Sequence, residues 1–201
     1  AQGAPSVSVE TEGELINGTF SDGLTGWRVA VFSGHGYVTT SESELWVTTQ
    51  TVDDRLTVVQ SVYGLSTERP YVLSAEVNVE GMEEGRGAYV RLQFRDEADG
   101  YTRDHMHSPS LNATDGWEPI ELYFYVPDGT SRVMVELFAE YAVGTARFRN
   151  VRLEPFTGEF RIDSLSARPL PRGAVELSWQ LPFAEFFDEP SVQYAVYRAP
   201  L

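Results

Sequence analysis

Residues 55–81 read RLTVVQSVYGLSTERPYVLSAEVNVEG, two runs of alternating apolar and polar side chains joined by a segment rich in turn formers. Alternation with a period of two is typical of strands that bury one face, whereas a helix needs apolar residues three and four positions apart. Gly64 and Pro70 mark the join, because glycine permits turn conformations and proline interrupts regular structure. This stretch therefore predicts two β-strands.

The same alternation recurs along most of the chain, and helical spacing is absent. We predict strands at 55–63, 70–81, 87–96, 117–127, 132–141 and 145–155. Short turn-forming segments separate them, with the sequences GMEEG, DEADG, NATDG and PDGTS. Many strands at such spacing predict an all-β protein that is built as two packed sheets or as a closed barrel.

The segment NGTFSDGLTGW, residues 17–27, places three glycines, an Asn and an Asp beside two large aromatic residues. Glycine permits positive φ, and Asn and Asp bond to their own backbone, so the segment predicts a series of compact turns. Phe20 and Trp27 are costly to leave in water. We therefore expect the turns to aim both rings into a core.

Composition excludes several classes of partner. The 201-residue chain has a formal net charge of -15 and no cysteine. Such a surface repels nucleic acid and anionic membranes, and no apolar run approaches the length of a membrane span. All 15 basic residues are arginines scattered along the chain, which codon preference explains more simply than anion binding. The polar start AQGAPSVSVE is typical of a chain that has lost a signal peptide, which favours secretion.

Residues 14–154 resemble the galactose-binding-like jelly-roll carbohydrate-binding modules of families four, nine and twenty-two. The landmarks are the opening ELINGTFSDGLTGW, the segment VVQSVYGLSTERPYVLSAEVNVEG, the strand GWEPIELYFYVP and the closing strand ARFRNVRLE. The resemblance implies a two-sheet jelly-roll β-sandwich that binds a poly- or oligosaccharide. It also implies that Trp27 and Trp117 lie in the core.

The character of the chain changes near residue 155, so we divide it into 1–156, the jelly roll, and 157–201. Residues 160–201 resemble the first three strands of a fibronectin type III domain, with Trp179 as its core tryptophan. The three strands are FRIDSLSA, AVELSW and VQYAVYR. Three strands cannot close a sandwich, so either the domain is cut short or another polypeptide completes its sheet.

Alternation also selects candidate sugar-binding residues. If Val90, Leu92 and Phe94 face the core, their neighbours along the strand face the opposite way. The resemblance implies that the strands 87–96, 117–127 and 132–141 share one concave sheet. On such a sheet, exposed rings stack on sugars and polar groups form hydrogen bonds with hydroxyls. The candidates are Tyr89, Arg91, Gln93, Tyr123, Tyr125 and Glu136.

Two alternatives to a sugar-binding site on this concave sheet stay open. Tyrosines that face one another across strands can simply stabilise an exposed sheet. The site can instead lie in loops at the sandwich edge, where the available rings are Tyr37, Trp46, Tyr101, His105 and His107.

The resemblance also implies a structural calcium ion between the opening turns and the last strand. Ser21 stands where the family commonly has Glu, and Asn150 stands where it commonly has Asp. These differences remove two charges, although Asp22 can compensate for them. Two possibilities therefore stay open. Either Asp22 and Asn150 bind calcium, or this chain has lost the calcium site of the family.

These observations favour a non-catalytic carbohydrate-binding module over an enzyme, since no catalytic motif is present. We expect the module to be secreted and linked to a catalytic domain of the same parent protein, a glycoside hydrolase or polysaccharide lyase. The second hypothesis is a structural or adhesion module whose tyrosines pack on neighbouring domains. The third is a small β-sandwich hydrolase that uses a carboxylate pair.

Overall fold

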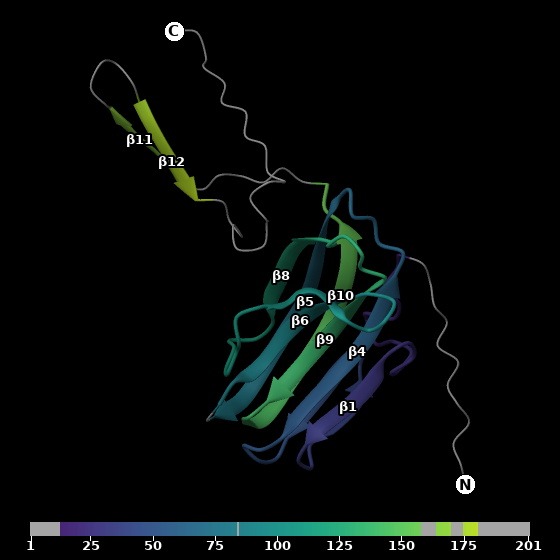
Figure 1. The fold of residues 1–201 in the computed structure, drawn as a ribbon. Helices are drawn as coiled ribbons and strands as arrows, with labels where there is room; N and C mark the ends of the chain where they lie inside the picture. The colour runs from purple at the N-terminus through teal and green to yellow at the C-terminus, as the bar shows by residue number, and fades with distance from the viewer. Residues whose placement is uncertain (1–12, 84, 158–163, 170–174, 181–201) are drawn as a thin grey trace.

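The computed structural model describes residues 13–83, 85–157, 164–169 and 175–180. Ten strands between residues 28 and 155 form two layers (Figure 1). The strand order is β1-β4-β9-β6-β7 in one layer, here called sheet A, and β2-β3-β10-β5-β8 in the other, called sheet B. All pairings within the two sheets are antiparallel. The predicted all-β, two-sheet sandwich is confirmed.

The six predicted strands all form, with ends that shift by a few residues. Sheet A contains β1 (Arg28–Ser33), β4 (Arg55–Tyr63), β9 (Arg132–Glu140), β6 (Gly87–Arg95) and β7 (Tyr101–His107). Sheet B contains β2 (Tyr37–Ser41), β3 (Glu44–Thr49), β10 (Val143–Pro155), β5 (Pro70–Glu83) and β8 (Glu118–Tyr125). Strands β1, β2, β3 and β7 were not among those predicted. Three of these four lie at sheet edges, where both faces are partly exposed and the apolar alternation is weak.

The core lies between the two sheets and is built from the inward half of each alternating strand. Val58 on β4 and Leu92 on β6 face it from sheet A, and Leu73 on β5 and Phe148 on β10 face it from sheet B. All four side chains are almost completely buried. Burial of such side chains is the main favourable term for the fold, at roughly 1.5–3 kcal/mol each.

The turns at 17–27 deliver their aromatic residues to the core, as predicted. Phe20 and Trp27 are both buried, with their ring centroids 5.4 Å apart. The Trp27 indole Nε1 donates a hydrogen bond to the carbonyl oxygen of Asn17 at 3.2 Å. Asn17 and Phe20 adopt left-handed backbone conformations, with φ of 49° and 54°. Consecutive tight turns therefore let the chain reverse while the rings point inward.

The prediction that Trp117 lies in the core is wrong. Trp117 is half-buried on the face of sheet B that points away from the core. The Arg149 guanidinium lies 4.0 Å from its ring centroid, and that of Arg147 lies 5.5 Å away. Trp117 immediately precedes β8, so its ring packs against charged side chains of β10 instead of the apolar interior.

Strands β11 (Ser164–Pro169) and β12 (Val175–Gln180) form an antiparallel hairpin in which Leu165 pairs with Trp179. They overlap two of the three strands predicted for a fibronectin type III segment and end one or two residues beyond them. The third, at residues 192–198, lies outside the described residues. The type III assignment and the boundary at residue 156 therefore stay predictions.

The described part of the chain contains no helix with the length and apolar character needed to cross a membrane.

Candidate functional site

The face of sheet A that points away from the core carries an extended network of polar side chains. On β6, Val90 and Leu92 face the core, so Tyr89, Arg91 and Gln93 point to the opposite face. The register of β6 with β9 pairs Tyr89 with Phe138 and Arg91 with Glu136. Side chains of paired residues lie on the same face, so tyrosine, arginine and carboxylate meet there. We call this the outer face of sheet A.

Three aromatic rings from three strands lie in a row on this face. Tyr89 and Phe138 are stacked with centroids 5.0 Å apart and planes 1° from parallel. Phe32 on β1 lies on the other side of Phe138, with centroids 6.2 Å apart. Tyr89 and Phe138 are fully buried, whereas Phe32 is 54% exposed. Phe32 is therefore the ring of this row that offers an open apolar surface.

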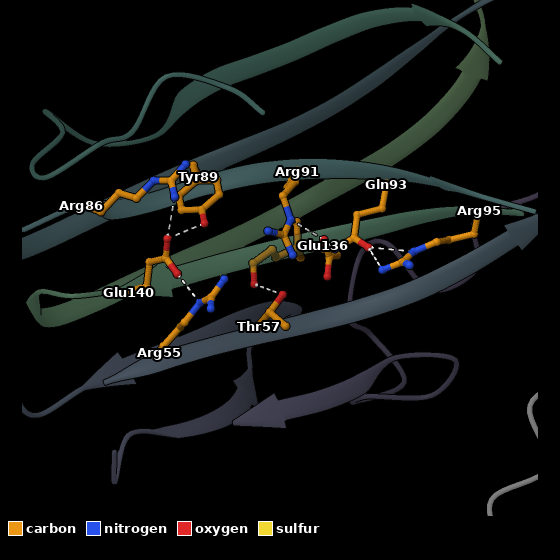
Figure 2. A network of polar contacts seen from close by, with 10 residues as sticks. Arg55, Thr57, Arg86, Tyr89, Arg91, Gln93, Arg95, Glu136 and Glu140 are labelled. Atoms are coloured by element: carbon orange, nitrogen blue, oxygen red, sulfur yellow. Dashed lines mark hydrogen bonds and ion pairs between the residues drawn. The ribbon is translucent and has the colours of Figure 1, made fainter. Parts of the chain in front are cut away.

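Glu140 anchors one end of the network (Figure 2). Its carboxylate accepts hydrogen bonds from Arg55 Nε at 2.6 Å, Arg86 Nη1 at 2.9 Å and the Tyr89 hydroxyl at 2.6 Å. The Glu140 side chain is fully buried. Burial and the neighbouring Glu140 carboxylate raise the pKa of Tyr89, so its hydroxyl stays protonated and remains a donor. Two cations thus flank one carboxylate.

Glu136 anchors a second cluster along the same strand. Its carboxylate accepts hydrogen bonds from Arg91 Nε at 2.6 Å and from Gln93 Nε2 at 2.8 Å. The Gln93 Oε1 atom in turn accepts a hydrogen bond from Arg95 Nη2 at 2.7 Å (Figure 2). Gln93 and Glu136 are both buried. Ion pairs and amides bonded in this way hold their side chains in a single arrangement.

Guanidinium groups lie over the aromatic row. Arg91 Cζ lies 4.4 Å from the centroid of Phe138, and Arg86 Cζ lies 4.3 Å from that of Tyr89. Arg55 Cζ lies 4.7 Å from the centroid of Phe32. These cation–π contacts explain how two rings on an outward face become buried. A ligand would therefore meet arginine N–H groups and Phe32 before it met Tyr89.

Strand β7 borders the face on the side of β6. His105 and His107 are exposed there, with ring centroids 6.1 Å apart, and His107 lies edge-on to Tyr89 at 5.9 Å. Partial desolvation of its ring and the charges of Arg91 and His107 lower the pKa of His105. His105 is therefore neutral at pH 7, where its ring nitrogens can both donate and accept hydrogen bonds.

The prediction that all six candidate residues share one sheet is wrong. Tyr89, Arg91, Gln93 and Glu136 do meet on sheet A, but β8 pairs with β5, which places Tyr123 and Tyr125 in sheet B. Alternation correctly predicts that these tyrosines point away from the core. It carries no information about which of the two sheets a strand joins.

Tyr89 was also expected to be exposed, and this is a second correction. Its ring is fully buried beneath Arg86 and against Phe138. Alternation also predicts that Phe138 and Glu136 are exposed, but both side chains are buried. An outward-pointing side chain is buried when longer side chains on neighbouring strands fold over it.

Tyr123 has a different setting on sheet B. Its hydroxyl donates to a Glu121 carboxylate oxygen at 2.5 Å, and its ring lies edge-on to Phe156 at 5.0 Å. Burial and the Glu121 carboxylate raise the pKa of Tyr123 to about 12. Because Phe156 follows β10 directly, Tyr123 contacts the segment that leads out of the sandwich.

The rings that were assigned to edge loops all lie on strands instead. Tyr37 and Trp46 belong to β2 and β3 of sheet B, and Tyr101, His105 and His107 belong to β7. Sequence reasoning did not select Phe32, Arg55, Arg86 or Glu140 as site residues. The register of β1 with β4 shifts between Val31 and Ser33, at Phe32. Such a bulge interrupts the alternation of side chains, so the face on which Phe32 lies cannot be read from the sequence.

Calcium binding through Asp22 and Asn150 stays a prediction, and the contacts around the opening turns bear on it. The side-chain amide of Asn17 donates to the carbonyl oxygens of Gly23 and Thr25, both at 3.0 Å, which are the kind of oxygens that calcium binds. The Asn150 side chain bonds to Glu76 on β5. Within the described residues no three His, Asp or Glu side chains gather in a way that could hold a metal ion.

Because the Asn17 amide already bonds to the carbonyl oxygens of Gly23 and Thr25, we predict that calcium does not change the stability of the folded protein. Saturating calcium and an excess of EDTA should give melting temperatures within about 1 °C of each other, because a ligand raises stability only by binding the native state. Differential scanning calorimetry measures this directly. A calcium-dependent rise of several degrees that Asp22→Asn abolished would instead support a bound ion at Asp22.

Comparisons with known proteins address the fold. No protein-family profile matches the chain, and no curated protein does. Among solved structures, the enzymatically active domain of tailspike protein 4 from bacteriophage CBA120 superposes with a TM-score of 0.63 at 16% identity. The match covers 71% of this chain but only 21% of the tailspike chain. That tailspike's activity therefore says nothing direct about this chain.

Two further matches are to carbohydrate-binding modules. A family 4 module superposes with a TM-score of 0.50 at 14% identity, covering 70% of this chain and 98% of that module. The chain therefore shares its β-sandwich fold with this carbohydrate-binding module as well as with the tailspike domain. The family 22 module and catalytic domain of a Clostridium thermocellum xylanase, complexed with xylohexaose, give a TM-score of 0.51 at 14% identity. That match covers 70% of this chain and 28% of the xylanase chain.

Proposed function

We propose that this chain is a non-catalytic carbohydrate-binding module and that the outer face of sheet A binds the glycan. The observation that carries the proposal is the exposed ring of Phe32 beside a fixed network of arginine, glutamine and glutamate side chains. A sugar has apolar C–H faces that pack on aromatic rings and hydroxyls that form hydrogen bonds with polar groups. A sugar-binding site therefore combines an exposed ring with polar side chains, as this face does. The fold shared with carbohydrate-binding modules supports the same reading.

The free-energy cost of burying the Glu136 and Glu140 carboxylates supports a binding role for this face. Glu136 and Glu140 are buried charges, and burying an ion pair contributes little net stability, since desolvation offsets most of the attraction. Apolar residues at the same positions would serve a purely structural sheet equally well. Polar groups that are held rigidly are useful to a ligand, because binding then costs less conformational entropy.

The expected affinity is modest. An exposed ring covering about 60 Å² of a sugar contributes roughly 1.5 kcal/mol, and a few net hydrogen bonds add roughly 1 kcal/mol each before the cost of association. Dissociation constants should lie in roughly the micromolar to millimolar range. Such binding suits a module that is secreted with a linked glycoside hydrolase or polysaccharide lyase, where the linkage raises the effective concentration of the enzyme at its substrate.

The proposal predicts that Phe32→Ala weakens polysaccharide binding about tenfold, because it removes the open apolar surface of the site. Isothermal titration calorimetry against a panel of soluble polysaccharides measures the effect. Tyr37→Ala is the matched control, since Tyr37 is an aromatic residue of similar exposure on sheet B. Equal affinities for both variants and the unmodified protein would place the site elsewhere.

A structural or adhesion module is the second candidate, and one observation favours it. Tyr123 packs edge-on against Phe156, so this tyrosine already contacts the segment that follows the sandwich. In this candidate the face of sheet B that carries Tyr123 and Trp117 packs on a neighbouring domain. A panel of neutral and acidic polysaccharides that shows no binding to the folded protein would favour it over glycan binding.

A further inference from the structure

Five of the 15 arginines, which are far apart in the sequence, lie together on the outer face of sheet A. Ion pairs on this face involve five arginines, Arg55, Arg86, Arg91, Arg95 and Arg132. They involve three carboxylates, Asp99, Glu136 and Glu140. This network therefore carries an excess of positive charge in a chain whose formal net charge is -15.

The excess has two sources: Arg55 and Arg86 share Glu140, and Arg95 and Arg132 share Asp99. The first of these lies beside an exposed aromatic ring. Figure 2 shows the Arg55 and Arg86 guanidinium groups reaching Glu140 from opposite sides. One buried carboxylate cannot neutralise two cations. By contrast, Arg91 and Glu136 form a one-to-one pair. The charge that Glu140 leaves unbalanced thus lies beside Phe32, whose ring is in contact with Arg55.

Both arginines keep donors for a ligand. A guanidinium group has five N–H donors, and within the described residues Arg55 and Arg86 each donate one hydrogen bond, to Glu140. Their side chains are 30% and 38% exposed. A planar guanidinium matches a carboxylate or sulfate in a paired hydrogen-bond geometry that a lone hydroxyl cannot reproduce.

We infer that the glycan bound on this face is anionic, with a carboxylate or sulfate ester held between Arg55 and Arg86 and its sugar ring against Phe32. This inference rests on the proposed function. The overall negative charge opposes a polyanion only weakly, because salt screens charges more than about 8 Å apart at physiological ionic strength. Local contacts with the two arginines therefore decide the preference.

Matched polymers test the inference by calorimetry on the complete chain. Polygalacturonate is compared with its carboxyl-reduced, neutral form, and dextran sulfate with dextran, so that carboxylate and sulfate recognition are separated. We expect at least one anionic polymer to bind about tenfold or more tightly than its neutral counterpart, as one charge-assisted contact would give. Tighter binding of the neutral polymers, or equal binding, overturns the inference but leaves glycan binding intact.

Arg86→Gln tests where the charge acts. Glu140 keeps Arg55 and Tyr89 in this variant, so the fold should survive, and a thermal melt checks this. Binding of the anionic polymer should weaken about tenfold, whereas Arg152→Gln, which removes an exposed arginine from β10 of sheet B, should change it less than twofold. Equal losses in both variants would mean non-specific attraction and overturn the inference. If no polymer binds the folded protein, the proposed function fails with it.

Discussion

Asp54→Ala should lower the free energy of unfolding by about 3 kcal/mol, because Asp54 ties together the turns beside Phe32. Its buried carboxylate accepts hydrogen bonds from the backbone N–H of His35 at 3.1 Å and of Gln50 at 2.6 Å, and from the Thr51 hydroxyl at 2.7 Å. Removing it leaves these donors unsatisfied. Urea denaturation measures the loss.

Asp53→Asn is the matched control for this change. Asp53 is the exposed neighbour of Asp54, and a surface substitution of this kind usually alters stability by less than about 0.5 kcal/mol. A loss in Asp54→Ala no larger than that of the control would show that the turns hold without the carboxylate. Because the 33–36 turn follows Phe32 directly, the Asp54→Ala variant should also bind glycan more weakly.

The same carboxylate makes stability depend on pH. Burial alone would raise the pKa of Asp54, but hydrogen bonds from Gln50, Thr51 and His35 outweigh it and lower the pKa from 3.8 to about 2. A pKa that is lower in the folded state stabilises the protein above the unfolded value and loses this effect as pH falls through the folded value. The stability difference between the unmodified protein and Asp54→Asn should therefore shrink by about 2 kcal/mol between pH 5 and pH 2.

Asn17→Ala is expected to cost a similar amount, about 3 kcal/mol, for two separate reasons. The Asn17 side chain accepts a hydrogen bond from the Asp22 N–H and donates to the carbonyl oxygens of Gly23 and Thr25. Its backbone also has φ of 49°, a conformation that asparagine tolerates better than alanine. Thermal and urea unfolding measure the combined loss.

Asn17→Gly separates the two reasons. Glycine adopts positive φ without strain but makes no side-chain hydrogen bonds, so this variant should be about 1 kcal/mol more stable than Asn17→Ala. Thr19→Ala is the control, because Thr19 is an exposed residue of the same turns. Identical stabilities of the glycine and alanine variants would show that the backbone conformation contributes nothing.

The strands of the sandwich interior could be predicted from the sequence because their environment is regular. The segment 55–63 was predicted with the bounds that β4 has in the structure. A strand with one face in the core must alternate, and each turn between strands needs glycine, proline, Asn or Asp. At the edges these constraints weaken. Strand β1 is exposed along most of its length, and it was not predicted.

The candidate site was predicted only in part, because some of its residues lie on one strand and others are brought together by strand pairing. Tyr89, Arg91 and Gln93 share a face because they are two residues apart on one strand, and this spacing is visible in the sequence. Glu136 joins them only because β9 pairs with β6. Phe32, Arg55 and Arg86 come from three further segments, and no local pattern relates them to Glu140.

The sequence by itself determined the all-β class, the side of strands such as β6, β8 and β9 that faces the core, and the turns that bring Trp27 inward, since these depend on neighbours along the chain. Tertiary structure alone decided that Tyr123 and Tyr125 lie in the sheet opposite Tyr89, that Arg86 covers Tyr89, and that five arginines from distant segments meet on one face of an acidic protein. These depend on which strands become neighbours. That choice is made by long-range packing of the two sheets, which alternation of side chains does not encode.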